Sequence, residues 1–479
     1  MALNLIRNAR AFFTTKTTAG VVDGTGHTNA TTFELQVLDG LSFSQNTNSE
    51  QVTISEAGTQ PVRGQRSFNT SLAPVDFSFS TYIRPRFSTN VLCEESVLWN
   101  ALTSTVAQNT ALTKSGTYTS ASYTAATNRL LFTGTTPSYS GAAVGDKILI
   151  NGIVKAGSGT DAQARAVNGP ATVTAISPLE VELDVPAGTT DIAAANFSAS
   201  AVNLYTSGWG QGTVQSIAAF HGSNRNQLQT FGMIIIVDNV TYAIDNCALN
   251  EATIDFGLDG IATVQWTGQA TALRQLNTNA TASGGNFGGG LTGAYLEKVT
   301  TAPFITNKLS TATLRTAKAL GNISANTPYY LALTGGSITI SNNISYITPA
   351  ILGVVNQPAT YYTGTRSITG TLNAYLNTGA VTGFGGGTGN LLKDMLAAAS
   401  TVTEPMFSST VAIGGGANTP RVELEMPSVT IGVPSVNTEQ VVSTAITFTA
   451  AASDQPGTGG TIVYNLEKTN DLVVRYFAA

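Results

Sequence analysis

The sequence predicts an all-β protein with short helices, and three observations support that prediction. Only 11% of the 479 residues are charged, against about 25% in an average soluble protein. Strand-favouring residues such as Thr, Val, Ile, Tyr and Phe take the place of the helix-favouring Glu, Lys and Arg. Several segments alternate polar and apolar residues, and 48 glycines supply turns between them. The hydrophobic content of 42% is enough to give each of about three domains a core.

The first elements expected along the chain are two strands and a helix. Strands are predicted at residues 41–44 and 78–83, where apolar and polar residues alternate. A helix is predicted at residues 93–104, where Glu94 and Glu95 suit the positive end of the helix dipole. The next strand of this unit does not arrive until about Phe231.

The interval before Phe231, more than 100 residues long, is predicted to hold a separate module. Four strands are expected in it, at residues 129–134, 146–152, 171–176 and 179–185. Short strands joined closely by Gly, Pro, Ser and Asn are typical of a small barrel. A surface loop that accepts a whole domain has to face solvent, so we expect this module on the outside of any assembly.

Two regions of the chain share one pattern, which indicates an internal duplication. Residues 252–268 alternate, with Ile254 and Phe256 on one face and Thr253 and Asp255 on the other. Residues 421–433 and 443–450 alternate in the same way. The alignment we predict places residues 253–254 over 430–431 and residues 265–266 over 447–448.

The similarity between the two regions extends upstream. Residues 78–83 match 371–376, each is followed by a helix, the second at residues 389–400, and residues 41–44 match 344–347. Four domains or segments are therefore predicted: a first discontinuous domain over residues 1–104 and 213–276, an inserted small β domain over 105–212, a linker over 277–292, and a second copy of the first domain over 293–479.

The residue types that carry catalysis are scarce. His27 and His221 stand in segments expected to be surface loops, and no metal-binding spacing such as HExxH or CxxC occurs. Cys93 and Cys247 are too few for a disulfide framework. We expect them to be buried small side chains, with one pair across a core as the alternative. No catalytic residue, cofactor or metal is predicted.

Three glycines, Gly288, Gly290 and Gly293, match the spacing of a dinucleotide-binding loop. They do not open an amphipathic helix, so no helix N-terminus would meet a pyrophosphate, and the segment fits a linker better.

Charge and hydropathy exclude two further classes of partner. The net charge is −5 and no cluster of Lys and Arg occurs, as tight phosphate-backbone binding would need. The longest apolar run, at residues 233–237, is far shorter than a bilayer-spanning helix. Arg7 and Arg10 interrupt the stretch where a signal peptide would be apolar. No membrane partner is expected.

The order and spacing of several segments resemble the tail tube proteins of long-tailed bacteriophages, in the duplicated form whose three subunits make a ring. The segments are LNLIRNARAFF, LDGLSFSQNTNSEQVTISEAGTQPVRGQRSFN, FSFSTYIRP, VLWNAL, IDNCALNEATIDFGLDGIATVQWTG, NNISYITPA and ITGTLNAYLN. The inserted module departs from that form.

The resemblance implies a structural virion protein with two tail-tube domains, each giving about four strands to a common inner barrel. Trimeric, pseudo-hexameric rings would stack into a tube that conducts DNA into the host. The implied partners are further copies of the chain, the tape measure protein and then genomic DNA in the lumen, and the tail tip and tail terminator proteins at the ends. The implied location is the virion tail, after assembly in the host cytoplasm, and the outward module favours a non-contractile tail.

A barrel of roughly 24 strands leaves a wider channel than porins of 16 to 18 strands. DNA slides best past a polar, mildly acidic wall that offers no Lys or Arg contacts. The candidate lumen-facing residues are Glu423, Glu425, Asp255 and Thr253. The same alternation is also typical of the solvent side of an ordinary sandwich.

Two alternative functions stay open from the sequence. One is a secreted or surface carbohydrate-binding or adhesive β protein, and the other is a different ring component of the tail tip. If the chain forms rings, residues 49–65 and 361–369 are expected to be loops that become ordered on ring contact.

Overall fold

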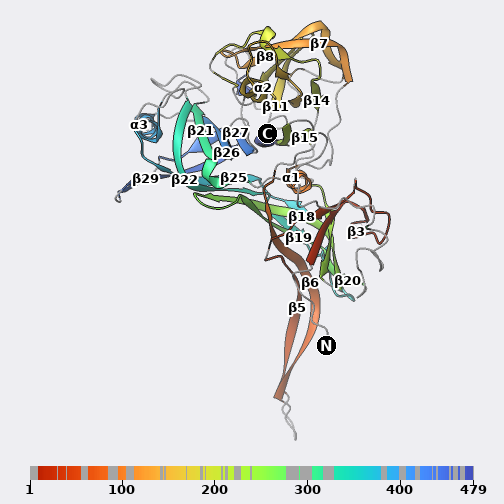
Figure 1. The fold of residues 1–479 in the computed structure, drawn as a ribbon. Coiled ribbons are helices and arrows are strands. Elements are labelled where there is room, and N and C mark those ends of the chain that lie inside the picture. Colours follow the sequence, from red (N-terminus) through yellow and green to blue (C-terminus); the bar gives the residue numbers. More distant parts are fainter. Residues whose placement is uncertain are drawn as a thin grey trace.

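The computed structural model is mostly β, which confirms the predicted all-β class with short helices (Figure 1). An 18-stranded sheet contains most of the strand residues, and a six-stranded barrel-like sheet stands apart from it. The structure describes residues 9–29, 31–38, 40–55, 63–84, 95–103, 113–140, 144, 147–168, 170–183, 187–188, 190–205, 209–210, 214–220, 228–237, 240–276, 291, 305–316, 328–378, 386–398, 406–415, 421–433, 435–438, 441–451, 455–456, 462–463 and 470–477.

The first half of the large sheet is built from seven main strands and one helix. Its strands are β1 (Ala9–Thr14), β4 (Thr32–Leu35), β5 (Ser42–Ser55), β6 (Arg63–Tyr82), β17 (Phe231–Val237), β18 (Val240–Gly257) and β19 (Thr263–Ala270), with β20 (Ala272–Leu276) at its edge. Helix α1 (Ser96–Thr103) follows β6. The predicted helix at residues 93–104 is thus present and begins at Ser96 in the described part of the chain.

The second half repeats this order of elements. Its strands are β21 (Thr311–Thr316), β22 (Pro328–Ser341), β25 (Ser367–Tyr375), β26 (Met406–Gly414), β27 (Arg421–Ile431), β28 (Ser435–Thr438), β29 (Val442–Ala451) and β32 (Asn470–Phe477). Helix α3 (Thr388–Ala398) follows β25 as α1 follows β6.

The two halves also pair their strands in the same way. In the first half β1 pairs with β17, β17 with β18, β18 with β19, and β19 with β6. In the second half β21 pairs with β26, β26 with β27, β27 with β29, and β29 with β25. Even the bulges agree, because the irregularity between Phe231 and Met233 recurs between Phe407 and Ser409. The duplication therefore holds at the level of hydrogen-bonded ladders.

The ladders correct part of the predicted alignment. Ser80 pairs with Gln265, which pairs with Thr253. The equivalent row in the second half is Asn373, Ala445 and Ser435. Residues 253–254 therefore correspond to 435–436 rather than to 430–431, and residues 265–266 to 445–446 rather than to 447–448. The alignment of 78–83 with 371–376 agrees with the ladders. The predicted match of 41–44 with 344–347 is wrong, because Ser44 pairs with Asp76 as Thr339 pairs with Thr369, so residues 41–44 correspond to 336–339. Residues 344–347 form β23, which pairs with β24 instead.

Long strands cross from one layer of the fold to the other. The start of β18 pairs with β17 and β20, and its end pairs with β19 and β22. One continuous hydrophobic core fills the space between the layers of both halves. In the first half Trp99 of α1 packs edge-to-face on Trp266, with ring centroids 4.9 Å apart. The indole of Trp266 donates to Thr81 Oγ1 at 2.9 Å. Both tryptophans are fully buried in this core.

A facing glycine and phenylalanine exchange strands between the two copies. Phe77 of β6 lies opposite Gly268 of β19, where an added Cβ would come within 2.4 Å of the phenyl ring. At the equivalent place in the second half the residues are swapped, with Gly370 on β25 and Phe448 on β29, and the distance is again 2.4 Å. Each site has room for one aromatic ring, and covering a strand glycine with a neighbouring aromatic side chain stabilises a sheet.

The six-stranded sheet is built from residues between α1 and β17. Its strand order is β14 (Asn203–Tyr205), β9 (Lys147–Asn151), β11 (Pro170–Ile176), β12 (Leu179–Leu183), β8 (Arg129–Ser140) and β7 (Thr113–Thr124). It has its own hydrophobic core, and α2 (Asp161–Val167) packs beside it. Figure 1 shows this unit at the top of the molecule, away from the β5–β6 hairpin. All four strands predicted in the interval are present.

The remaining short elements complete the chain. They are β2 (Thr17–Thr18), β3 (Val21–Val22), β10 (Val154–Lys155), β13 (Phe197–Ser198), β15 (Trp209–Gly210), β16 (Val214–Phe220), β23 (Ile344–Ile347), β24 (Thr360–Thr363), β30 (Gln455–Pro456), β31 (Ile462–Val463) and the 3-10 turns Ala194–Asn196 and Asn307–Leu309.

Loop predictions for two segments are wrong, and His27 lies in a loop as predicted but is not at the surface. Residues 49–65 were expected to form a loop, but β5 and β6 continue through the described part of this segment as a long two-stranded arm, and residues 361–369 contain parts of β24 and β25. His27 is only 4% exposed. Its Nε2 donates to the carbonyl of Asp23 and its Nδ1 accepts from Thr32, each at 2.8 Å. Polar partners four and five residues away satisfy both ring nitrogens, so the side chain can be buried, which composition does not reveal.

Cys247 is free and buried, as predicted. Cys93, His221 and most of the predicted linker at 277–292 lie outside the described residues.

Candidate functional site

Eight strands form a continuous sheet in which each half contributes four. The order is β5, β6, β19 and the end of β18 from the first half, then β22, β25, β29 and β28 from the second. The two halves meet at an internal seam, where Glu251–Gly257 of β18 lie antiparallel to Gly335–Ser341 of β22. The predicted four strands per domain are therefore present as one sheet.

The two faces of this sheet differ completely in chemistry. Side chains such as Ile254, Trp266 and Ile338 are fully buried against the core. Alternate residues point to the opposite face. That second face, which we call the hydroxyl face, is mostly polar and also carries Ala445, Tyr82 and Tyr375. Its polar residues are Ser42, Ser44, Asp76, Ser78, Ser80, Glu251, Thr253, Asp255, Thr263, Gln265, Thr267, Gln269, Ser337, Thr339, Ser341, Ser367, Thr369, Thr371, Asn373, Thr447, Thr449 and Ser435.

Neighbouring side chains on the hydroxyl face bond to one another across strands. Gln269 Nε2 donates to Asp76 Oδ1 at 3.0 Å, and across the internal seam the hydroxyls of Thr253 and Thr339 lie 3.3 Å apart. Side-chain hydroxyls and amides held in this way give a wall that is polar without being strongly charged.

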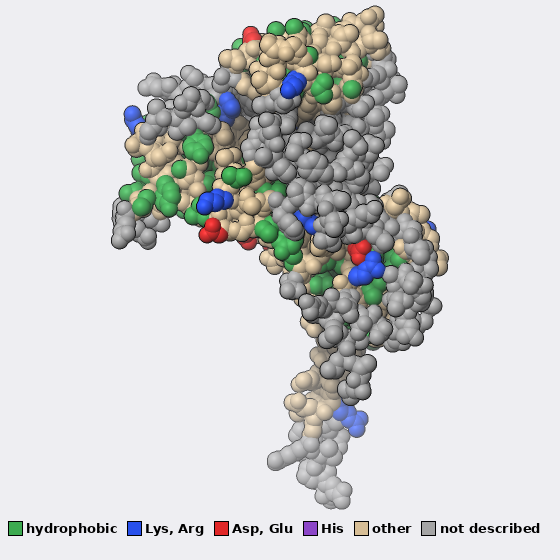
Figure 2. Space-filling view, viewed as in Figure 1, with side chains coloured by type: hydrophobic (Ala, Val, Ile, Leu, Met, Phe, Trp, Pro, Cys, Tyr) green, Lys and Arg blue, Asp and Glu red, His purple; other side chains and the backbone are tan. Residues whose placement is uncertain are grey.

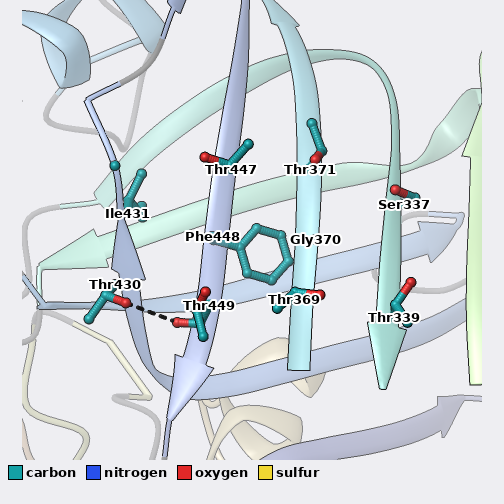
Figure 3. Close-up of a pocket in the computed structure, with 11 residues that line it drawn as sticks. Ser337, Thr339, Thr369, Gly370, Thr371, Thr430, Ile431, Thr447, Phe448 and Thr449 are labelled. Carbon is teal, nitrogen blue, oxygen red and sulfur yellow. Dashed lines mark hydrogen bonds between the residues drawn. The ribbon is translucent and has the colours of Figure 1, made fainter. Parts of the chain in front are cut away.

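The hydroxyl face is hollowed over the second half. Residues of β22, β25, β29 and β27 line a hollow of about 490 Å³. Figure 3 shows Thr447 and Thr449 of β29 beside Thr369 and Thr371 of β25, with Ser337 and Thr339 on the next strand. Thr430 Oγ1 donates to the carbonyl of Thr449. The hydroxyl face is therefore concave over β22, β25 and β29.

Charge on the hydroxyl face has one sign. Its only charged residues among the described positions are Asp76, Glu251 and Asp255, with no Lys or Arg on the face. A phosphate approaching this wall would meet like charge and neutral hydroxyls rather than cations.

The eight-stranded sheet has an unpaired strand at each end. Among the described residues, β5 pairs only with β6, and β28 pairs only with β29. Edge strands expose a row of backbone N–H and C=O groups, which natural proteins usually cover or pair. Both ends of this sheet therefore have backbone groups available to pair with a further strand.

The structure separates the four predicted lumen residues into two pairs. Thr253 and Asp255 lie on the hydroxyl face. Glu423 and Glu425 lie on the part of β27 that pairs with β26 and β32 in the other layer. Glu423 accepts from Arg421 Nε at 2.6 Å, and Glu425 is 5% exposed and lies 2.7 Å from Arg475 Nη2. Both carboxylates therefore form ion pairs with arginines of the same subunit.

Most of the hydroxyl face was missed in the sequence. The rows Thr369–Thr371 and Thr447–Thr449 alternate Thr with apolar residues as clearly as residues 252–256 do. Searching for uncharged hydroxyl alternation, in place of carboxylates, would have found them.

Neither a metal-binding cluster nor a membrane-spanning helix occurs among the described residues. No group of three or more His, Cys, Asp and Glu side chains there is arranged to hold a metal ion. No helix in the same residues has the length and hydropathy that crossing a membrane requires.

Comparison with known proteins supplies one relative. The chain is 25% identical over 461 residues to "Tail tube protein pb6" of Escherichia phage T5, which covers 95% of this chain and 74% of the relative. No family model matches the chain. An Escherichia coli P pilus tip assembly intermediate aligns with 98% of this chain and 67% of its own, at 10% identity and a TM-score of 0.08, a score at which the likeness carries no argument. The resemblance to tail tube proteins of long-tailed phages is confirmed.

Proposed function

We propose that this chain, a relative of the tail tube proteins of long-tailed phages, forms trimeric rings that stack into a tube and that its hydroxyl face lines the bore through which DNA passes. The observation that carries the proposal is the hydroxyl face itself, an eight-stranded wall rich in Ser, Thr, Asn and Gln that is hollowed over its second half. Among the described residues it carries three carboxylates and no Lys or Arg. Adhesion of DNA to protein depends on cationic contacts that release counterions. A wall without such contacts lets DNA slide.

The two open edges support ring formation. Three copies, each giving eight strands, would close a barrel of about 24 strands, and barrels of 16 to 18 strands already hold an aqueous channel. Closure would also remove both unpaired edges from solvent. The internal pseudo-twofold repeat makes such a trimer pseudo-hexameric.

Exposed apolar side chains at the ends of the strands support stacking. The connection between β23 and β24 presents Leu352, fully exposed, with Ile351 and Val354 more than half exposed. It lies beyond the end of β22 where the β5–β6 arm also begins, because Asn356 bonds to the backbone of Thr70 and Leu72. At the other end of the same strands Leu258 is 50% exposed. Head-to-tail contacts between unlike ends build open filaments.

The six-stranded unit completes the proposed picture. We place residues 105–212 on the outer wall as an inserted domain between the two parts of the first tail-tube domain, 1–104 and 213–276, with the second tail-tube domain at 293–479 after a linker at 277–292. A module on the outer wall leaves no room for a closely fitting sheath, so the proposed tail is non-contractile. The tape measure protein would fill the bore before DNA, and the tip and terminator proteins would bind the ends.

Electron microscopy of the purified protein at rising concentration tests this function. Rings with a central hole, and stacks of such rings at high concentration, are the expected result. Single particles at every concentration, together with retention on carbohydrate columns, would favour the adhesive alternative instead.

A charge variant tests the bore. Thr447→Lys adds one cation to an exposed position of the hydroxyl face, and Val144→Lys adds one to an exposed position of the six-stranded unit. Assembled Thr447→Lys tubes should retain short duplex DNA in a salt-dependent way, whereas wild-type and Val144→Lys tubes should not. Equal retention by the two variants would contradict a bore lined by the hydroxyl face.

A further inference from the structure

The internal seam between β18 and β22 offers a template for a contact between copies of the chain. β28 continues β27 along β29 just as the end of β18 runs along β19. β5 stands beside β6 as β22 stands beside β25. At the internal seam β18 pairs with β22, and the equivalent of β22 in the first half is β5. The equivalent of the end of β18 in the second half is β28. Among the described residues, β5 and β28 are both unpaired on the side that the seam covers.

We propose that β28 of one copy pairs antiparallel with β5 of the next copy, in the register of the internal seam. This inference rests on the ring proposed above and specifies its subunit contact. At the internal seam Thr253 lies opposite Thr339 and Ile254 opposite Ile338. The ladders make Ser435 the equivalent of Thr253. Since Thr339 pairs with Thr369 as Ser44 pairs with Asp76, Ser44 is the equivalent of Thr339. Ser435 therefore lies opposite Ser44 of the next copy.

Burial supports this register. Ile254 and Ile338 are both 0% exposed because each covers the other across the internal seam. Their equivalents at the open edges are Val436 and Phe43. Val436 is 41% exposed and Phe43 is only partly buried. Placing Val436 opposite Phe43 would cover the exposed Val436 and the part of Phe43 that its contacts with Tyr242 and the core leave exposed, as the hydrophobic effect favours.

The hydroxyl face gives a second, independent check. In the proposed register Ser435 and Ser44 fall on the same face as Thr253 and Thr339, so the hydroxyl face continues from copy to copy without a break. A shift of one residue would place Ser435, which points to the hydroxyl face, opposite Phe43, which points to the core. A shift of two residues would keep the faces but misplace the apolar pair.

Engineered cysteines test the register in assembled protein. The Thr253 and Thr339 hydroxyls are 3.3 Å apart across the internal seam, and directly opposed residues of antiparallel strands have the Cα separation that disulfides require. The double variant Ser435→Cys with Ser44→Cys should form a disulfide when treated with oxidised glutathione, whose two halves leave as reduced thiols. Non-reducing gels should then show linked dimers and trimers in most of the assembled material.

Two matched controls complete the design. Thr253→Cys with Thr339→Cys should form the same bond within one chain, which shows that the seam geometry permits it. Ser435→Cys with Asn48→Cys places the second thiol four residues further along β5, roughly 13 Å away, and should give little linkage.

The outcomes separate this inference from the proposed function. Rings seen by microscopy with linked chains support both. Rings in which the Ser435→Cys and Ser44→Cys variant stays unlinked, or in which the Asn48→Cys pair links equally well, overturn the register but leave the ring intact. Absence of any ring in the wild-type protein overturns the proposed function and this inference with it.

Discussion

The two halves of the molecule share one ladder pattern but differ in what their equivalent strands touch. The end of β18 is covered on both sides, by β19 and β22, and its apolar residue Ile254 is fully buried. The equivalent β28 is covered on one side only, and Val436 is 41% exposed. The second half therefore has an open strand edge, at β28, in the place where β22 covers the end of β18 in the first half. The chain therefore contains one complete strand junction, between β18 and β22, and the two unpaired strands, β28 and β5, that a second junction of the same kind would need.

The strongest test of the comparison concerns the buried ion pair of the second half. Glu425 and Arg475 correspond, through the ladders, to Ala243 and Leu276 of the first half. Glu425→Gln removes the carboxylate that lies 2.7 Å from the buried Arg475 guanidinium and should lower the free energy of unfolding by about 3–5 kcal/mol. The double variant Glu425→Ala with Arg475→Leu copies the first half and should recover most of that loss. Urea denaturation followed by intrinsic fluorescence measures both.

If the double variant were as unstable as Glu425→Gln, the two sites would not be interchangeable and the structural equivalence would fail at this position.

The exchanged aromatic pair gives the next largest effect. Phe448→Gly uncovers Gly370 and should cost at least about 3–5 kcal/mol of unfolding free energy, because Phe448 is 4% exposed. Gly370→Phe alone should also destabilise, since even a Cβ there would lie 2.4 Å from the Phe448 ring. The double variant Phe448→Gly with Gly370→Phe reproduces the arrangement of Phe77 and Gly268. A double-mutant cycle should show a favourable coupling of about 1–3 kcal/mol.

Additive losses in that cycle would mean that the two glycine sites are not equivalent.

Equivalent residues at the finished and open junctions should respond differently to truncation. Ile254→Ala should lower the free energy of unfolding of the free subunit by about 2–5 kcal/mol. Val436→Ala removes a side chain that is 41% exposed, so it should change that free energy by less than about 0.5 kcal/mol. Its effect should appear in assembly, as a higher protein concentration needed to form rings. Light scattering during concentration measures this second quantity.

Equal losses of subunit stability for Ile254→Ala and Val436→Ala would show that β28 is already covered in the free subunit.

The smallest expected effect concerns pH and is confined to the first half. Burial lowers the pKa of His27, so the folded protein holds this imidazole neutral at a pH where the unfolded chain protonates it. Stability from this group is complete above its ordinary pKa of about 6.5 and is lost as pH falls below that value. The loss for one proton is at most about 1.4 kcal/mol per pH unit. Unfolding at pH 7.5 and 5.5 should show it in the wild type and not in His27→Gln.

The fold could be predicted further from the sequence than the site could. Alternation and composition identify the all-β class, both helices of the repeat and the strands of the inserted unit. The register of the second copy could not be found, because a period of two fixes the face of a strand but not its position along the partner. Residues 430–431 and 435–436 fit that period equally well, and only hydrogen-bonded ladders distinguish them.

The site depended on side chains from distant positions. Thr253 and Asp255 could be assigned to the solvent face from alternation alone. Glu425 could not be excluded, since its partner Arg475 lies 50 residues further along the chain and meets it only because β32 pairs with β27. The open edges are also invisible to sequence patterns, since an edge strand and a central strand alternate alike.

Hydrogen exchange in the free and the assembled protein tests the central claim most directly. In residues 42–46 and 435–438, the backbone amides that point away from β6 and β29 should exchange fast in the free subunit and slowly in rings. The amides of residues 251–257 and 335–341 should be slow in both states. Protection of the first two segments already in the free subunit, or their continued fast exchange in rings, would contradict a tube closed through these two edges.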